Sequence, residues 1–344
     1  MVTIIGGGIA GSALAGALAR RGDRVALYEQ QPTGGGGAFL FIDGRGHDAM
    51  TALGVAESDL HAVSYPVAGL RYVNSVGRRG EMNGRGHRFW LRRNLMQVLD
   101  DFVAGSGVET HYTTPITDIS LGADSCTLHH DGATTSADGL IVGCDGIDSV
   151  VRSRLDPDRT PVYAGDVVLY GTTRDPLELP TEPSALHFFA EIGADGIPGS
   201  TVGHIWRPGD LAYWFIRLPR DALEGTDDLG LRPVGEWAQA VRDASPSNAD
   251  LVGTLLDHTD AVHVSNARNV PLDTAQPPAL PVVLVGDADH AITPAAGVGA
   301  RDALEDVHAV FDALVTGESP ARAMAERRRR IGAERDQVQR RRAG

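Results

Sequence analysis

A glycine-rich turn close to the N-terminus constrains the fold of this chain more than any other feature. The chain passes there from a short apolar run, 2–5, into a small-residue run, 9–20. Gly6, Gly8 and Gly11 have the Gly-x-Gly-x-x-Gly spacing of a parallel strand–helix–strand unit. In such a unit the first glycine permits a tight turn, the second lets backbone approach a pyrophosphate, and the third lets helix and strand pack closely. The helix start would also offer N–H groups and the positive end of its dipole to the pyrophosphate. We therefore expect a dinucleotide-binding unit here.

An acidic residue follows at the position where such units bind a ribose. The apolar run 24–28 is typical of a second strand and leads to Glu29, 18 residues after Gly11. A carboxylate there can accept a hydrogen bond from a ribose hydroxyl and repels a 2′-phosphate. A tight turn without a ligand would explain the glycines alone, but the flanking strands and Glu29 favour a bound dinucleotide.

A second glycine motif, Gly286-Asp287, follows the strand-like apolar run 281–285. A helix with one apolar face comes after it. The residues of that face are Ala300, Ala303, Leu304, Val307, Phe311 and Leu314. The first motif is suited to the pyrophosphate and the second to the rest of the same molecule, so together they indicate FAD. The nucleotide-binding lobe would then be discontinuous, with parts at both ends of the chain.

The middle of the chain, from about 165 to 267, has a different texture. The runs 186–189, 204–206 and 211–218 are strand-like and are separated by Gly, Pro and Asp. Most of the large aromatic residues lie here, namely Phe188, Phe189, Trp206, Tyr213, Trp214 and Phe215. They could form the floor of an aromatic-substrate pocket, and an ordinary sheet core explains them equally well.

Shorter segments complete the predicted fold. We expect a strand at 70–74, a helix at 92–103, and antiparallel strands at 125–129 and 139–142, while 34–37 forms a loop. The sequence predicts an α/β fold, in which a Rossmann-like FAD-binding lobe contains an inserted mixed β-sheet lobe. The FAD-binding domain would comprise 1–66, 91–164 and 268–332, the substrate-binding sheet lobe 67–90 and 165–267, and a basic C-terminal tail 333–344.

The charged composition argues against several partners and mechanisms. The chain has 45 acidic and 31 basic residues, a net charge of −14, and no lysine. An acidic surface disfavours nonspecific binding to nucleic acid or anionic membranes. The absence of lysine excludes Schiff-base and Walker-lysine mechanisms. The arginines of 327–330 and 340–342 are expected on a solvated terminal helix.

Cysteine use and hydropathy indicate a protein of the cytoplasm. Two cysteines, Cys126 and Cys144, provide neither a disulfide framework nor a four-ligand metal site, and each is expected to be a small buried side chain. No run approaches the ~20 apolar residues of a membrane span. No basic segment precedes the first apolar run, so secretion is not expected.

Three separated motifs resemble those of the single-component FAD-dependent aromatic hydroxylases, the para-hydroxybenzoate hydroxylase fold family of class A flavoprotein monooxygenases. The N-terminal glycines are the first. The second is 144–152, Cys-Asp-Gly-Ile-Asp-Ser-Val-Val-Arg, which is similar to the family's Asp-Gly-x-x-Ser-x-x-Arg. The third is 286–290, Gly-Asp-Ala-Asp-His, followed by Pro294 and by 297–299, Gly-Val-Gly. The likeness covers almost the whole chain.

The resemblance implies a set of FAD-binding residues. Asp287 would accept hydrogen bonds from the ribityl chain, and Pro294 with 297–299 would lie beside the isoalloxazine ring. The helix that follows would stabilise negative charge on the reduced ring. Arg92, or Arg93 if the alignment shifts by one, would reach the cofactor. The complete set is Gly6, Gly8, Ile9, Ala10, Gly11, Glu29, Gln30, Arg92, Asp145, Gly286, Asp287, Pro294, Gly297, Val298, Gly299 and Ala300.

Some members of this set have structural alternatives. Arg92 could be a solvated helix arginine and Asp287 a helix cap, and His290 is expected to be a packed loop histidine. Family members often have arginine where this chain has Gln30. Likewise, Val298 and Arg301 stand where glutamine and asparagine are common.

The implied reaction is oxygen insertion. NADH or NADPH would reduce noncovalently bound FAD, and O2 would give a C4a-(hydro)peroxyflavin that hydroxylates an aromatic or polycyclic small molecule. The flavin then carries the chemistry, so we expect no catalytic side chain and no metal, with a monomer or homodimer as the assembly.

Three alternatives remain open. One is an oxidase, epoxidase or Baeyer-Villiger enzyme of the same fold. Another is a flavin halogenase, which the absence of lysine disfavours. The third is a flavin-bound protein that binds or cyclises a ligand without net redox chemistry, which Val298 and Arg301 leave open.

Overall fold

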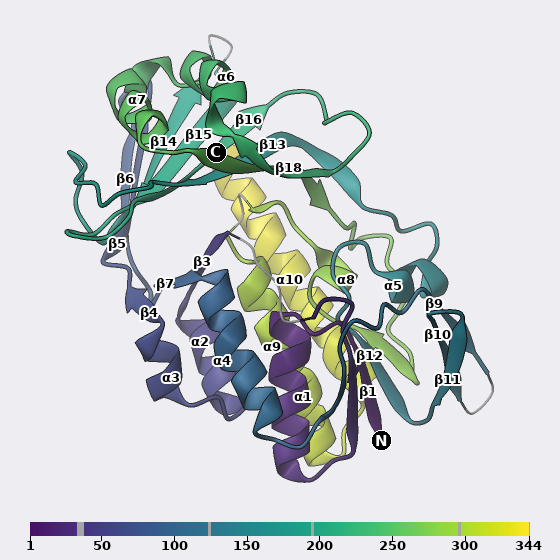
Figure 1. Ribbon diagram of the computed structural model, residues 1–344. Helices are drawn as coiled ribbons and strands as arrows, with labels where there is room; N and C mark the ends of the chain where they lie inside the picture. The colour runs from purple at the N-terminus through teal and green to yellow at the C-terminus, as the bar shows by residue number, and fades with distance from the viewer. Residues whose placement is uncertain (33–37, 123–124, 194–195, 295–296, 344) are drawn as a thin grey trace. The chain divides into compact units, whose positions relative to one another are not determined.

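The computed structural model describes residues 1–32, 38–122, 125–193, 196–294 and 297–343 (Figure 1), so the expected loop 34–37 lies outside the described residues. Two compact units are present. The first comprises Met1–Ser64, Trp90–Val162 and Arg268–Gly344, and the second comprises Tyr65–Phe89 and Tyr163–Ala267. The second unit is thus inserted twice into the chain of the first.

The first unit is built on a parallel sheet. Its described strands have the order β19-β12-β1-β2-β8, and every pair is parallel. They are β1 Val2–Ile5, β2 Val25–Tyr28, β8 Glu109–His111, β12 Leu140–Gly143 and β19 Val282–Leu284. Strands from both ends of the chain, β1 and β19, therefore belong to the same sheet, with β12 between them.

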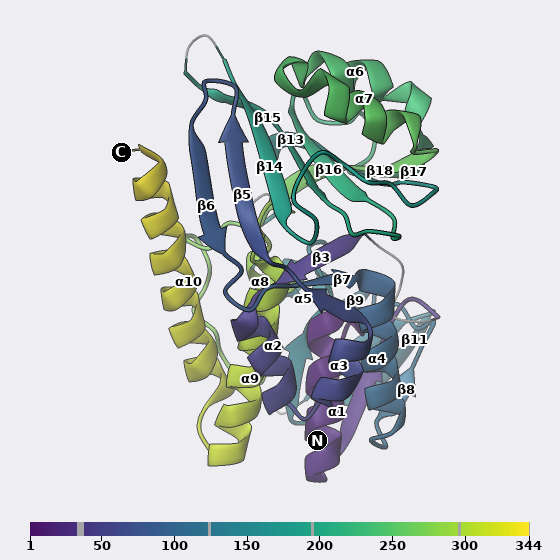
Figure 2. The same cartoon turned by 90° about the vertical axis from the view of Figure 1, so that its left-hand side faces the viewer.

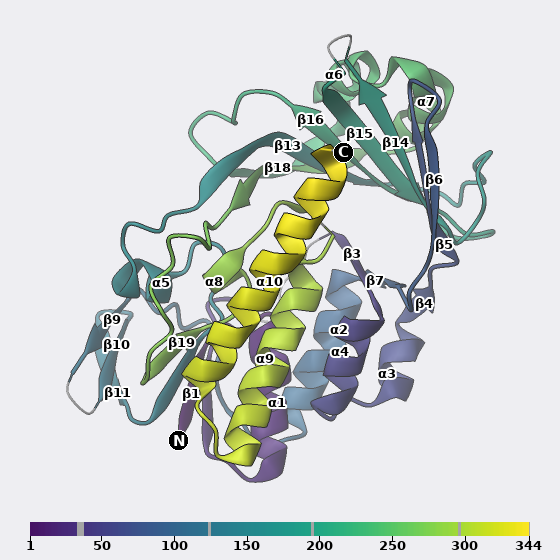
Figure 3. The ribbon, with the colours of Figure 1, turned by 180° about the vertical axis from the view of Figure 1, so that it is seen from behind.

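Helices cover one face of this sheet, and a small antiparallel sheet covers the other. The first layer contains α1 Ile9–Arg21, α2 Gly44–Ala52, α3 Glu57–Ala62, α4 Arg92–Ala104, α9 Gly299–Thr316 and α10 Pro320–Ala343. The second contains β9 Asp118–Leu121, β10 Cys126–His130, β11 Ala133–Ala137, α5 Val150–Leu155 and α8 Asp287–His290. Side chains of β1 alternate accordingly, since Ile4 packs in the first layer and Ile5 in the second. Figure 3 shows α10 lying along α9.

The expected pairing of 125–129 with 139–142 is wrong. β10 turns at Asp131 and Gly132, both with positive φ, and pairs with β11. Positive φ at both central residues is the geometry of a type I′ hairpin. The sequence of β11, Ala-Thr-Thr-Ser-Ala, is too polar to be recognised as a strand, and β12 joins the parallel sheet instead.

The second unit is a mixed sheet with helices on one face. Its described strands have the order β17-β18-β13-β16-β15-β14-β5-β6. They are β5 Gly69–Asn74, β6 Arg79–Asn83, β13 Val162–Thr172, β14 Leu186–Ile192, β15 Pro198–Ile205, β16 Tyr213–Pro219, β17 Asp228–Pro233 and β18 Ala261–Asn269. The helices α6 Ala238–Asp243 and α7 Ala249–Asp257 lie together over one side of the sheet (Figure 2) and share its apolar core.

A small sheet has the strand order β3-β7-β4. Its strands are β3 Phe39–Ile42, β4 Ser64–Pro66 and β7 Arg88–Leu91. The chain passes from the first unit into the second within β4, and it returns to the first unit within β7. Among the described residues, no helix combines the length and the apolar character needed to cross a bilayer.

Candidate functional site

The three N-terminal glycines meet different surroundings. A Cβ atom at Gly6, where φ is +101°, would lie 2.3 Å from the carbonyl oxygen of Cys144. A Cβ atom at Gly11 would lie 1.9 Å from the carbonyl oxygen of Gly6. At Gly8, apart from its two neighbours in the chain, no described heavy atom would lie within 4 Å of a Cβ atom. The fold itself therefore requires glycine at 6 and 11, whereas it leaves the space beside Gly8 open.

The turn leads directly into the start of α1. Gly8 is the N-cap residue, and among the described residues no side chain caps this end of the helix or places an acid in its first turn. The N–H of Ser12 donates to the Gly8 carbonyl at 2.9 Å, so the helical bonding pattern starts there. Ile9, Ala10 and Gly11 form the first turn, whose N–H groups have no preceding turn of helix to accept them.

Glu29 lies beside this turn. Its Oε2 accepts from the Gly7 N–H at 2.6 Å, and its Oε1 accepts from the Gln31 N–H at 2.6 Å. These two bonds hold the buried carboxylate at the end of β2, next to the glycines. Gln30 is exposed.

Arg92 and Asp287 come from distant parts of the chain and lie close enough to interact electrostatically. Arg92 is the first residue of α4, and burial lowers the pKa of its guanidinium while the carboxylates of Asp287 and Glu29 act in the opposite direction. Asp287 follows Gly286 and is the first residue of α8. Its side chain is open to solvent, yet the surrounding protein raises its pKa through desolvation. The negative charges of Asp287 and Glu29 therefore both act on the Arg92 guanidinium.

The start of α9 lies next to Asp287. A Cβ atom at Gly299, the first residue of α9, would lie 3.7 Å from Asp287 Oδ1. Val298 is the N-cap residue and Ala300 the second residue of the helix. The Gly297 N–H donates to the Pro294 carbonyl at 3.0 Å. A second helix start thus lies beside Asp287.

Asp145 is occupied differently. Its Oδ1 accepts from Ser149 Oγ at 2.6 Å and its Oδ2 from the Val151 N–H at 3.2 Å, so the carboxylate fixes the start of α5. Burial raises its pKa, against the effect of the Ser149 hydrogen bond. Arg152, in the same motif, is buried and donates to the carbonyls of Ile147, Arg159 and Ala288. Asp145 and Arg152 therefore both bind other parts of the chain itself.

A buried ionic network supports the third motif, and sequence reasoning missed its central residue, Asp306. Asp306 Oδ2 lies 2.6 Å from His290 Nε2 and accepts from the Gly286 N–H at 3.0 Å. Asp306 Oδ1 accepts from Arg327 Nε at 2.8 Å. His290, expected to be a packed loop histidine, is buried and ends the short helix α8. The detectable signal was an aspartate within the apolar face of α9, because an acid there needs a buried partner.

The C-terminal arginines correct another expectation. Arg327 is 5% exposed, and Arg328 donates to Asp289 at 2.6 and 2.8 Å. Arg329 and Arg330 are exposed and pair with Glu326 of the same helix. The solvated helix expected for 327–330 is therefore wrong for its first two arginines, because the helical period turns them inward. α10 also continues without a break past residue 333.

The side chain of Arg301, one of the departures from the family pattern, is engaged by carboxylates of three elements. It pairs with Asp302 at 2.6 Å, Glu334 at 3.0 Å and Asp43 at 3.5 Å. Asp43 caps α2, and Glu334 belongs to α10. Arg301 thus links three helices of the first unit.

In the second unit, aromatic side chains form a row across the sheet face opposite α6 and α7. Strand register places Tyr72, Phe188, Gly203, Phe215 and Tyr170 next to one another on successive strands. The rings of Phe188 and Tyr170 each lie 6.1 Å from that of Phe215, between centroids. A Cβ atom at Gly203 would lie 2.2 Å from the Phe215 ring, so this ring lies over the glycine. The rings of this aromatic row are partly exposed.

The central aromatics are divided between the two faces of the sheet. Phe189, Trp206 and Trp214 belong to the core under α6 and α7, whereas Phe188 and Phe215 lie on the other face. Both cysteines are free; Cys126 is buried, and Cys144 is partly exposed.

Comparison with known proteins identifies the relatives of the chain. The family model described as FAD binding domain matches residues 1–331. Kynurenine 3-monooxygenase of Salinispora arenicola is 28% identical over 94% of this chain and 74% of its own length. The 3-amino-4-hydroxybenzoate 2-monooxygenase of Streptomyces cremeus is 25% identical over 91% of this chain and 78% of its own. The crystal structure of CtdE in complex with FAD and substrate 4 has a TM-score of 0.79 at 17% identity, over 96% of this chain and 86% of that one. This last likeness concerns the fold alone.

Proposed function

This chain belongs to the FAD binding domain family, and on that premise we propose that it is an FAD-dependent monooxygenase that hydroxylates an aromatic or polycyclic small molecule with NADH or NADPH as electron donor. The relatives reported above are monooxygenases of aromatic substrates by their names. The substrate class is carried over from them and from the aromatic row of the second unit.

One observation supports FAD binding above all: two helix starts, Glu29, Arg92 and Asp287 are brought together beside an unobstructed Gly8. A dinucleotide needs N–H donors for its pyrophosphate and a carboxylate for its ribose, and this arrangement offers both. The residues of the first unit therefore fit the cofactor.

Each residue has a distinct role in the proposed complex. The N–H groups of 9–11 bind the pyrophosphate, Glu29 accepts from the adenosine ribose, and Arg92 neutralises phosphate charge. Asp287 accepts from the ribityl hydroxyls. Bound FAD supplies the transfer of reducing equivalents from the nicotinamide to O2. The start of α9, formed by 297–300, would favour negative charge on the ring of the bound cofactor.

Asp145 contributes indirectly, and the substrate is handled by the second unit. Because its carboxylate caps α5, Asp145 positions backbone rather than cofactor. The aromatic row offers a planar ring the face and edge contacts that aromatic pairs prefer. We expect the rings of Phe188 and Phe215 to select planar substrates.

The test combines cofactor and product analysis. Purified protein is reconstituted with FAD and mixed with NADH or NADPH, labelled O2, and either kynurenine or 3-amino-4-hydroxybenzoate, the substrates that the relatives' names suggest. Consumption of the nicotinamide with one labelled oxygen atom in a phenolic product supports hydroxylation.

Other results identify the alternatives. An epoxide or a ring-expanded ester would point to the related oxygen insertions, and an oxidised product without label would point to an oxidase. A flavin that stays oxidised with both nicotinamides and with each aromatic compound would favour a non-redox binding protein. Protein that stays colourless with FAD would end the proposal.

A further inference from the structure

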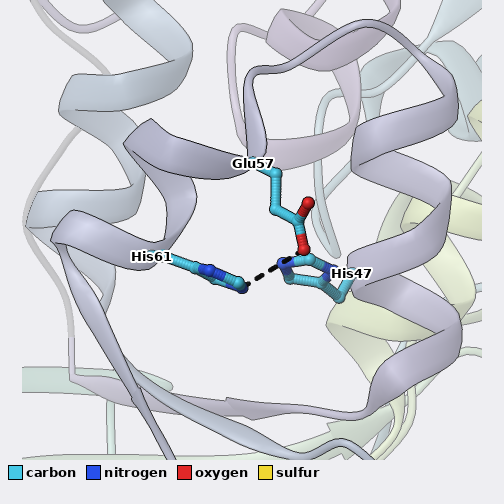
Figure 4. Close-up of side chains that lie close together, drawn as sticks. All are labelled: His47, Glu57 and His61. Carbon is cyan, nitrogen blue, oxygen red and sulfur yellow. Dashed lines mark ion pairs between the residues drawn. The ribbon is translucent and has the colours of Figure 1, made fainter.

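Three potential metal ligands gather on helices α2 and α3, in a cluster with no assigned role in the flavin site. His47 lies on α2, and Glu57 and His61 lie on α3. One ligand atom from each residue lies within 4.8 Å of the others. Figure 4 shows the Glu57 carboxylate and the two imidazole rings turned toward one another.

The fold holds these residues in place through the core beneath them. Glu57 and His61 are separated by one helical turn and so project from the same side of α3. The buried side chains of Met50, Leu53 and Leu60 anchor α2, the connection and α3. The juxtaposition of the three ligands therefore follows from packing and does not need an ion to create it.

The geometry fits a first-row divalent ion. His61 Nε2 lies 3.6 Å from Glu57 Oε1, close to the separation of about 3.4 Å that a tetrahedral site imposes at usual Zn–N and Zn–O lengths. The centroids of the two imidazole rings lie 5.2 Å apart, and the same geometry gives about 5 Å for two histidines on one ion. The three ligand atoms lie within 4.8 Å of one another, so binding one ion would require the side chains to rotate and bring the other ligand atoms closer.

The simpler explanation is an exposed histidine–carboxylate pair with a neighbouring ring stack. α9 contains such a pair, His308 and Asp312, whose Nε2 and Oδ2 atoms lie 3.3 Å apart. Among the described residues, no third ligand completes that pair into a group of three. His47 is what distinguishes the cluster on α2 and α3, because it is largely buried against the same two ligands.

We infer that His47, Glu57 and His61 form a Zn²⁺ site with a fourth position open to solvent. Two imidazoles and one carboxylate are a known zinc ligand set of this type. Because the ligands come from two helices, the ion would fasten α2 to α3. The expectation of no metal site depended partly on the small number of cysteines. A site made of histidine and glutamate cannot be recognised from cysteine content.

The experiment uses the untagged, FAD-loaded protein, because an affinity tag would itself bind zinc. The protein is stripped with a chelator and dialysed against ZnCl2, and bound zinc is measured by elemental analysis and by calorimetry against a competing chelator. The variants are His61→Ala and Glu57→Gln, both exposed, together with His47→Ala. His308→Ala is the matched control, since it removes a partly exposed histidine from a two-ligand pair.

We expect the unaltered protein and His308→Ala to bind one Zn²⁺ each with the same affinity. His61→Ala and Glu57→Gln should weaken binding at least about tenfold and abolish the zinc-dependent rise in unfolding temperature. Unchanged zinc affinity in these two variants, or no stoichiometric zinc in the unaltered protein, would overturn the proposal. FAD content should be equal throughout, so the result does not depend on the proposed function.

Discussion

The fold of the chain does not require glycine at position 8. A side chain at Gly6 would collide with the Cys144 backbone, and one at Gly11 would collide with the Gly6 carbonyl. At Gly8 the described atoms leave room for a larger residue, and the backbone is extended with a φ of −74°. A requirement for glycine at position 8 would therefore come from the ligand.

This difference gives a prediction. Gly8→Val should fold with little loss of stability, because the space is open, yet bind FAD at least about tenfold more weakly, or ~1.4 kcal/mol, because its methyl groups would occupy the pyrophosphate position. FAD affinity is measured by fluorescence titration and folding by circular dichroism. Gly235→Val is the matched control, because Gly235 lies in the second unit and also has open space around it. Equal FAD affinity in the two variants would contradict the assignment.

His290 gives a second prediction, on pH. Burial lowers its pKa, but the nearby carboxylates, Asp306 first among them, outweigh burial and raise the pKa to about 9. In an unfolded chain the pKa of histidine is about 6.5. The contribution of protonated His290 to stability is therefore complete below that pH and is lost as the pH rises toward 9. Urea unfolding midpoints should fall over this range more steeply in the unaltered protein than in His290→Gln, which keeps a hydrogen-bond donor. Parallel pH profiles for the two proteins would show that His290 is neutral.

At the scale of elements, α10 has two faces with opposite energetic importance. Arg327 is buried and pairs with Asp306 and Glu305, whereas Arg330 is exposed and pairs with Glu326 on its own helix. Arg327→Ala would leave a buried carboxylate short of a partner and should cost about 3–5 kcal/mol of unfolding free energy. Arg330→Ala should cost less than about 1 kcal/mol. Denaturant unfolding of both variants measures the difference, and equal losses would mean that the inward face of α10 is not a buried network.

Local patterns in the sequence predict elements better than they predict pairing. The apolar periodicity of α4 and α9 is found in the helices themselves. The sequence suggested a hairpin of β10 with β12, because both are strand-like runs on either side of a turn. The polar sequence of β11 hides the strand that pairs with β10. The position of Asp306 depends on three helices meeting, which the sequence of one helix does not contain.

The same limit applies to the candidate site. The glycine turn and Glu29 were recognised from spacing alone, and the structure places them in contact through the Gly7 N–H. The proximity of Arg92 to Asp287 was implied only by resemblance, because 194 residues separate them in the sequence. The zinc cluster was missed because its histidines are ordinary helix residues until α2 and α3 pack together.

At the scale of the whole molecule, the first unit is assembled from distant parts of the chain, and α10 secures the last of them. β19 joins the sheet beside β12, and α8 and α9 follow it with the third motif. Arginines of α10 then bind Asp289 and Asp306, and Arg335 donates to the His290 carbonyl at 2.7 Å. The C-terminal helix therefore holds the third motif of the candidate FAD site in place.

Truncation tests this role of α10. A chain that ends after Ser319 loses the arginines of α10 that bind Asp289, Asp306 and the His290 carbonyl, and also the core side chains of Met324 and Ile331. It should therefore fail to fold as the full chain does and should not retain FAD. A chain that ends after Gln337 keeps Arg335 and should match the full chain in FAD affinity, with an unfolding free energy within about 0.5 kcal/mol. Both are compared by FAD titration and denaturant unfolding. If the shorter chain bound FAD like the longer one, the site would stand without α10, and the buried ion pairs would have to be assigned to stability elsewhere in the unit.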